Sequence, residues 1–313
     1  MIMTNLIFMK KHLIIIGGPT ASGKTALAIR LAQHFLTEII SADSRQFYRE
    51  MSIGTAKPTE AELSLIKHHF INNISIQDAY SVGAFEKEAM AVLNGIFKKN
   101  DVAIMVGGTG LYIRAVCEGL DGFPEVPLSI RREFEDLLEK EGIEFLQNML
   151  QEVDNEYFMQ SDIHNSRRLI RALSVWKASG KPFSNFRKGS KTERFFEPIY
   201  IYLDVPRAEL YERINKRVDN MMADGLLDEV KKLSEYKNLI ALQTVGYSEL
   251  FDFLDGKMTL DEAIDKIKQH SRNYAKRQMT WFRKDAHWQR FESHAFDETL
   301  NTICFKIENI NLK

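Results

Sequence analysis

The segment GPTASGKT at residues 18–25 constrains the fold of this 313-residue chain more than any other feature. It matches the pattern G-x-x-x-x-G-K-S/T, in which glycines let successive backbone N–H groups converge on an anion. A run of branched apolar residues at 12–16 precedes it, and Leu27, Leu31 and Phe35 follow at helical spacing. A glycine-rich loop between a strand and a helix is the context that identifies a phosphate-binding loop. The chain is therefore predicted to bind a di- or triphosphate.

Each part of this loop has an expected role. Lys24 supplies a point charge, and the hydroxyl of Thr25 is the candidate Mg²⁺ ligand. We expect the diphosphate-binding residues to be Gly18, Pro19, Thr20, Ala21, Ser22, Gly23, Lys24 and Thr25.

The remaining apolar runs predict a parallel sheet. Candidate strands at 38–42, 102–106 and 199–203 follow the first strand and are separated by segments that include a predicted helix at 85–99. Alternating strands and helices indicate a parallel sheet with helices on both faces. After Pro206, the sequence predicts helices at 207–236, 244–254 and 259–283.

The middle of the chain shows no convincing strand. Predicted helices at 131–141, 143–153 and 165–178 indicate an inserted helical domain instead. We predict an α/β fold with a P-loop-type parallel sheet flanked by helices and an inserted all-helical domain. The catalytic core with its C-terminal helices is expected at 1–118 and 199–313, and the insertion at 119–198.

Charge is distributed unevenly along the sequence, although the chain has 42 Lys and Arg against 43 Asp and Glu. Residues 118–156 contain 12 acidic and 3 basic residues, whereas 162–194 contain 9 basic and 2 acidic ones. Residues 266–290 contain 8 basic residues and one Asp. Solvated helix faces explain such blocks, but two Arg-rich segments are also typical of a phosphate-rich partner.

Cysteine content and the N-terminus bear on the compartment. Two cysteines exclude a disulfide framework and a Cys-based metal site, which indicates a reducing compartment, and we expect a cytoplasmic protein. Lys10, Lys11 and His12 interrupt the apolar N-terminal stretch well short of the ~18 residues that a membrane helix needs. No membrane association is therefore expected. We also expect no obligate protein partner.

The strands give little support for nucleotide hydrolysis. Nucleotide hydrolases usually place a Mg²⁺-binding Asp after a second apolar strand. The run at 102–106 ends instead in Gly107-Gly108-Thr109, and Asp204 is better placed to start the helix after Pro206.

Asp43 follows the second predicted strand and is the candidate for acid–base chemistry. Open α/β sheets collect their ligands at the carboxyl ends of their strands. Asp43 can serve there as a general base or a Mg²⁺ partner, or it can be an N-cap within the sequence Asp-Ser-Arg-Gln.

A set of motifs in a fixed order resembles the bacterial tRNA dimethylallyltransferases. Besides the phosphate loop, it comprises SADSRQFY at 41–48, IGTAKP at 53–58, VGGTGLY at 106–112, RLIRAL at 168–173, SGKP at 179–182, LYERI at 210–214, RV at 217–218, VGY at 245–247 and YAKRQMTWFR at 274–283. The loop alone is shared by many families, but the remaining set is highly specific. The motifs span about residues 12 to 283.

The resemblance implies transfer of a dimethylallyl group from dimethylallyl diphosphate to tRNA. The acceptor in that family is N6 of the adenosine 3′ to the anticodon, at position 37, and diphosphate is released with Mg²⁺ as cofactor. A diphosphate leaving group explains a phosphate loop without a hydrolase's second acid.

The resemblance also implies roles for individual residues. Asp43 is the expected base, Arg217 is expected to stabilise the diphosphate, and Thr109 is expected near the reacting adenine. Arg213 lies four residues before Arg217, so both are expected to point inward from one helix face. The expected contacts with the tRNA anticodon stem-loop are Asp43, Ser44, Arg45, Gln46, Thr109, Arg131, Arg167, Arg168, Arg171, Lys276, Arg277 and Gln278.

Three alternatives remain open from the sequence. A P-loop small-molecule kinase needs no basic insertion, and an adenylate prenyltransferase uses free AMP as its acceptor. A non-catalytic RNA-binding module leaves the phosphate loop and Asp43 without a role. The pair His68-His69 is interpreted as structural, because neighbours in sequence point apart on a strand or helix.

Overall fold

The computed structural model describes residues 10–189 and 191–311, and the chain divides into two compact units. Met1–Glu118 and Arg194–Lys313 form the first unit, and Gly119–Glu193 form the second. Residues 1–9, which include most of the apolar N-terminal stretch, lie outside the described part. Within residues 10–189 and 191–311, no helix is long and apolar enough to cross a membrane.

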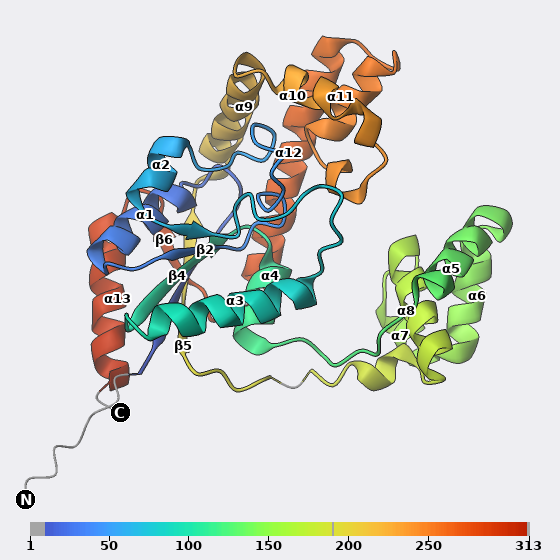
Figure 1. Ribbon diagram of the computed structural model, residues 1–313, viewed down its shortest axis with the longest axis horizontal. Helices are drawn as coiled ribbons and strands as arrows, with labels where there is room; N and C mark the ends of the chain where they lie inside the picture. The colour runs from blue at the N-terminus through green and yellow to red at the C-terminus, as the bar shows by residue number, and fades with distance from the viewer. Residues whose placement is uncertain (1–9, 190, 312–313) are drawn as a thin grey trace, which may run out of the picture. The chain divides into compact units, whose positions relative to one another are not determined.

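The first unit is built on a six-stranded parallel sheet with strand order β3-β2-β4-β1-β5-β6 (Figure 1). This confirms the predicted α/β class. The strands are β1 His12–Gly17, β2 Ile39–Ser41, β3 His68–His69, β4 Val102–Gly107, β5 Glu197–Asp204 and β6 Gln289–Glu292. The short strands β3 and β6 were not predicted, because two to four residues show no periodicity.

The register of the central strands positions the site. Gly17, the last residue of β1, pairs with Gly107, the last residue of β4. The phosphate loop and the Gly107-Gly108-Thr109 turn therefore leave the sheet side by side. Gly107 is required there, because a Cβ on it would lie 2.3 Å from the carbonyl oxygen of Ala42, the residue that follows β2.

Helices cover both faces of this sheet. Helices α1 (Lys24–His34) and α13 (Phe296–Asn311) pack on one face, through residues such as Leu31 and Ile303. Helices α3 (Val82–Phe97) and α4 (Gly110–Glu118) pack on the other, through residues such as Phe85.

Further helices form a smaller core with the segment after β2. They are α9 Arg207–Ala223, α10 Leu226–Lys232, α11 Tyr247–Leu254 and α12 Leu260–Arg283, with η2 Ser234–Tyr236, η3 Ile240–Leu242 and the separate short helix α2 Glu60–Leu65. The prediction of one helix over 207–236 is wrong. Gly225 adopts the left-handed conformation, with φ of 96°, and separates α9 from α10 because such a residue ends a helix.

The second unit contains only helices among its described residues. They are α5 Leu128–Glu141, α6 Ile143–Val153, α7 Asn155–Gln160, α8 Ser166–Ser179 and the 3₁₀ turn η1 Phe183–Phe186. Phe134, Leu146, Leu150 and Leu173 form the centre of its core. Strand β5 begins at Glu197, inside the range assigned from the sequence to the insertion, because Pro198 is tolerated near the start of a strand.

Candidate active site

The phosphate loop joins β1 to α1 at the carboxyl edge of the sheet. Gly18 and Gly23 have positive φ values of 152° and 88°, and Ala21 has a φ of 64°. Non-glycine residues rarely adopt that conformation, so the loop holds some strain at Ala21. Residues 20–26 line a cavity of about 350 Å³, which is the candidate diphosphate site.

Lys24 is the cation at the centre of this loop. Its Nζ donates a hydrogen bond of 2.6 Å to the carbonyl oxygen of Pro19. The pKa of Lys24 is lowered to about 7, chiefly by burial and then by the Arg217 guanidinium, while Asp43 acts in the opposite direction. A bound anion would reverse this balance, because it favours the charged ammonium.

Arg217 reaches the same cavity from α9. Its Nη1 donates a hydrogen bond of 2.9 Å to Oγ1 of Thr20, and burial lowers the pKa of Arg217. Arg213 was expected to point inward as well, but it contacts Glu209 at 2.5 Å and Ser293 at 3.4 Å. The helix therefore presents one cation to the cavity, because the neighbouring residues supply Arg213 with partners elsewhere.

Asp43 lies just after β2, between two cavities. Its Oδ1 accepts a hydrogen bond of 3.0 Å from the Arg45 backbone N–H. This contact closes a turn, but no helix begins at residues 44–47, so the N-cap interpretation is wrong. Asp43 lines both cavities.

The second cavity has a volume of about 640 Å³ and adjoins the first. The two share Thr20, Asp43, Thr55, Ala56, Arg217 and Tyr274, but only the first is lined by Lys24 and by residues 21–25 of the phosphate loop. Thr109 and Arg277 line only the second. The site is therefore divided into a phosphate-binding side and a second side that meet at Asp43.

Thr109 connects the ends of β2 and β4. Its Oγ1 accepts a hydrogen bond of 3.2 Å from the Ser44 backbone N–H and lies 3.4 Å from the Ser44 hydroxyl. Tyr274 of α12 lies beside it, and the pKa of Tyr274 is raised to about 12 by burial and by the nearby Asp43. The sequence singled out the motif that contains Tyr274 but assigned no role to this residue.

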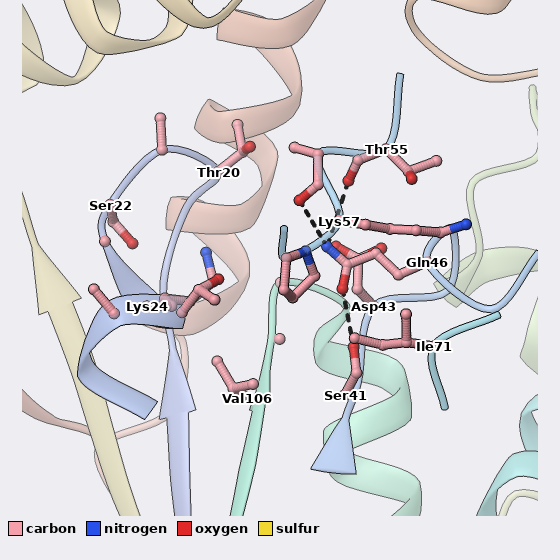
Figure 2. Close-up of a pocket in the computed structure, with 18 of the residues that line it drawn as sticks. Thr20, Ser22, Lys24, Ser41, Asp43, Gln46, Thr55, Lys57, Ile71 and Val106 are labelled. Atoms are coloured by element: carbon pink, nitrogen blue, oxygen red, sulfur yellow. Dashed lines mark hydrogen bonds between the residues drawn. The ribbon is translucent and has the colours of Figure 1, made fainter. Parts of the chain in front are cut away.

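Arg45 and Gln46 are both engaged by backbone groups. Nη1 of Arg45 donates to the carbonyl of Ala241 at 3.0 Å, and Nε2 of Gln46 donates to the carbonyl of Ala56 at 3.1 Å. Figure 2 shows Gln46 between Ser41 and the Thr55 segment, on the opposite side of the cavity from Lys24. These contacts shape the wall of the cavity, and the predicted contacts with tRNA remain predictions.

Gln278 is placed differently from its neighbours on α12. It is only 6% exposed, and both ends of its amide group bind backbone atoms of Thr20 and Gly108. Lys276 and Arg277 are exposed on the same helix. The predicted contact of Gln278 with tRNA finds no support in this placement.

The segment after Met51 forms a wall of the site, although no role was predicted for its residues from the sequence. Thr55, Ala56, Lys57 and Pro58 line the phosphate-side cavity, although only their resemblance motif marked them. Lys57 donates to the Tyr48 carbonyl at 2.5 Å and to Asn72 at 2.6 Å, and burial lowers the pKa of Lys57 to about 8.

A carboxylate on α10 anchors this wall. Oε2 of Glu229 accepts from the backbone N–H groups of Ser52 and Ile53 at 3.0 and 2.9 Å, and Oε1 accepts from Gly54 at 3.1 Å. The Tyr247 hydroxyl donates to the same Oε1 at 2.6 Å. No local sequence pattern indicates these contacts, because Glu229 lies at least 175 residues from the three backbone N–H groups that it binds.

The basic residues of the second unit lie on its surface. Arg167, Arg168 and Arg171 are exposed on α8, and the guanidinium of Arg171 lies 5.2 Å from the centre of the Phe123 ring. Arg131 on α5 pairs with Glu135 at 3.0 Å. All four are predicted tRNA contacts in the second unit.

A parallel sheet with a phosphate loop after a central strand defines the chain as a P-loop α/β protein. The family model of the IPP transferases matches residues 46–285. The chain is 54% identical over 301 residues to a tRNA dimethylallyltransferase of Christiangramia forsetii, covering 96% of this chain and 99% of the relative. It is 49% identical to that of Flavobacterium johnsoniae, covering 96% and 98%.

Solved structures agree with these similarities. The full-length tRNA isopentenylpyrophosphate transferase of Bacillus halodurans is 37% identical, with a TM-score of 0.72, over 96% of this chain and 98% of that one. A eukaryotic dimethylallyltransferase acting on tRNA is 26% identical, with a TM-score of 0.78, over 97% and 80%. The chain belongs to the IPP transferase family.

Proposed function

We propose that this protein transfers a dimethylallyl group from dimethylallyl diphosphate to N6 of adenosine 37 in tRNA, the adenosine 3′ to the anticodon. Diphosphate is the second product. The observation that carries the proposal is the pair of cavities that meet at Asp43, one of them with the phosphate loop. This division suits two substrates that react at their boundary, and the tRNA dimethylallyltransferases among the relatives support it.

The phosphate-side cavity suits a diphosphate leaving group. As the C–O bond of the donor breaks, negative charge accumulates on the diphosphate. Lys24, Arg217 and the backbone amides of the loop stabilise that charge in a largely buried site, where such contacts are stronger than in water.

Mg²⁺ fits this site as an ion that arrives with the diphosphate. Among the described residues, no group of three or more His, Cys, Asp or Glu side chains can hold a metal ion. Mg²⁺ commonly binds through one or two protein oxygens together with substrate phosphates and waters. Thr25, which lines the cavity, would hold it, and the ion would neutralise charge on the leaving diphosphate.

Asp43 is the proposed general base. The exocyclic amine of adenine is a weak nucleophile, and its N6 loses a proton as the C–N bond forms. A carboxylate at the boundary of the two cavities is placed to accept that proton. A positioned base contributes roughly 10²–10⁴-fold to a rate. Thr109 and Tyr274, which lie beside Asp43, line the side proposed for the adenine.

The exposed basic residues are proposed to bind the anticodon stem-loop. Arginine suits phosphates and base edges through its planar fork of donors. In the first unit these residues are Lys276 and Arg277, and in the second they are Arg131, Arg167, Arg168 and Arg171. The target adenosine must leave its stack to reach Asp43, as occurs in other enzymes that act on a base.

Incubation with dimethylallyl diphosphate and Mg²⁺ tests the function. Unmodified tRNA and AMP are supplied in separate reactions, and the nucleosides are analysed by mass. We expect dimethylallyl-adenosine from the tRNA reaction and none from the AMP reaction. Prenylated AMP would instead indicate an adenylate prenyltransferase, and ADP formed from ATP with small acceptors would indicate a kinase.

The variant Asp43→Ala tests the base. We expect the single-turnover rate to fall by roughly 10²–10⁴-fold, while the dissociation constant for tRNA stays within about twofold. Asp228→Ala is a matched control, because Asp228 is exposed on α10 and pairs with Lys231. A rate for Asp43→Ala near that of the control would exclude this residue as the base.

A further inference from the structure

We propose that Gln278 is a positioning residue that holds the phosphate loop and the Gly107-Gly108-Thr109 turn in one geometry. It does so from inside the protein, without contacting tRNA. The expected effect of Gln278 on the rate of prenyl transfer rests on the proposed function. Its effect on diphosphate binding can be measured without that function.

The amide of Gln278 bridges two backbone segments. Its Oε1 accepts a hydrogen bond of 2.9 Å from the Thr20 N–H, and its Nε2 donates one of 3.0 Å to the Gly108 carbonyl. The side chain is 6% exposed. The amide oxygen thus binds the phosphate loop and the amide nitrogen binds the turn after β4. The spacing of these two loops therefore depends on the Gln278 side chain.

These two loops lie where the two cavities meet. Thr20 lines both cavities, Gly108 lines the phosphate-side cavity, and Thr109, next to Gly108, lines only the side proposed for the adenine. Reacting atoms must be held about 3–3.5 Å apart for efficient transfer. A bridge between Thr20 and Gly108 therefore sets the distance between the leaving group and the acceptor.

The phosphate loop needs an external support at this point. Ala21, directly after Thr20, has an unfavourable φ of 64°. Thr20 is held on both sides, because its N–H binds Gln278 and its hydroxyl accepts from Arg217. Strained backbone persists only where surrounding contacts hold it, and Gln278 supplies one of the two contacts named at Thr20.

Gly108 leaves room for this bridge. A Cβ on Gly108 would lie 2.1 Å from Nε2 of Gln278. One turn further along α12, Trp281 meets Gly110, where a Cβ would lie 2.3 Å from its ring. The buried face of α12 is thus packed tightly against the turn after β4, whereas Lys276 and Arg277 lie exposed.

The variant Gln278→Met tests the proposal, because it keeps the size of the side chain and removes both hydrogen bonds. We expect the dissociation constant of inorganic diphosphate with Mg²⁺ to rise about tenfold. The single-turnover transfer rate should fall about ten- to a hundredfold, and the dissociation constant for unmodified tRNA should stay within about twofold. Thermal unfolding of the variant shows whether it is folded.

Arg277→Ala is the matched control from the adjacent position of α12. It should weaken tRNA binding and leave diphosphate binding unchanged, the reverse of Gln278→Met. If Gln278→Met instead weakened tRNA binding and spared diphosphate binding, Gln278 would be an RNA contact and the proposal would be wrong. Unchanged diphosphate binding in a folded variant would also overturn it.

Gln278→Glu gives a second readout that a purely structural role does not predict. A protonated carboxyl can accept from Thr20 and donate to Gly108, as the amide does, whereas the ionised form can only accept. The activity of this variant relative to wild type should therefore rise at least about tenfold as pH falls through the pKa of the new carboxyl. A ratio that does not change with pH would contradict the bridge.

Failure of the proposal and failure of the proposed function remain distinguishable. If the wild-type protein prenylates no tRNA, the function is wrong, whereas the diphosphate and tRNA titrations still test Gln278. If wild type is active and both titrations of Gln278→Met match it, only the role of Gln278 is wrong.

Discussion

The protein holds two kinds of cationic side chain, and they differ in their surroundings. Lys24 and Arg217 face the phosphate-side cavity, where burial lowers the pKa of each. Arg167, Arg168 and Arg171 lie exposed on α8 of the other unit. In a buried site each charge interacts strongly, and its protonation depends on its neighbours. On the surface, salt screens each charge, and several must act together.

This difference predicts that the loss of one buried cation lowers activity more than the loss of one exposed cation. Lys24→Met should lower kcat/KM for dimethylallyl diphosphate by about 10³-fold, because it removes a buried donor aimed at the leaving group. Steady-state assays with saturating tRNA measure this loss. Lys231→Met, on the surface of α10, is the control and should retain activity. If Lys24→Met lowered kcat/KM by less than about tenfold, a buried cation would not contribute more to activity than an exposed one.

The lowered pKa of Lys24 predicts a pH-dependent affinity. In the free protein this pKa is about 7, and a bound diphosphate raises it by favouring the charged form. Binding therefore takes up a proton above pH 7, and the affinity should fall by up to about tenfold per pH unit there.

Calorimetry in buffers of different ionisation enthalpy measures this proton uptake. Diphosphate itself titrates in the same range, so Lys24→Met provides the reference for the ligand alone. Equal proton uptake by wild type and Lys24→Met would show that Lys24 is already fully charged before binding.

The exposed cations should act through salt. Replacement of Arg167, Arg168 and Arg171 by Ala is expected to flatten the plot of log affinity for tRNA against log salt concentration by about 2 units. Lys177→Ala is a control on the same helix, because Lys177 already pairs with Glu133. A triple variant with an unchanged slope would place the RNA elsewhere.

The smallest expected effect is on stability. Because the pKa of Lys24 is lower in the folded protein than its ordinary value of 10.5, the unfolded chain binds more protons between pH 7 and 10.5. Lys24 therefore destabilises the free protein most at pH 7 and below, and this cost disappears as pH rises towards 10.5. Lys24→Met should unfold at a temperature higher by at least about 2 °C at pH 7, with the gap closing at higher pH.

Scanning calorimetry of both proteins without ligand across this pH range measures the gap. A constant difference at every pH would assign the effect to packing instead of charge.

Local patterns predicted the sheet and the phosphate loop well. The strands at 12–16, 102–106 and 199–203 are confirmed within β1, β4 and β5, because buried parallel strands are continuous apolar runs. The break at Gly225 was missed, because an isolated glycine within a helical pattern does not always end a helix.

Individual side chains on a predicted helix were harder to interpret. Arg213 and Arg217 share a helix face in sequence spacing, yet only Arg217 lines the cavity. Lys276, Arg277 and Gln278 belong to one motif, yet only the first two are exposed. Spacing gives the direction of a side chain relative to its own helix, but not what packs against that helix.

The sequence by itself determined that this chain has a P-loop α/β fold and belongs with enzymes that prenylate tRNA. These features depend on contiguous motifs, which can be recognised without knowing where distant parts of the chain lie. Only the tertiary structure decided that two cavities meet at Asp43 and that Gln278 joins Thr20 to Gly108. The bridge links residues separated by 258 and 170 positions, and no local pattern constrains such pairs. Their contact follows from the packing of α12 against the ends of two strands.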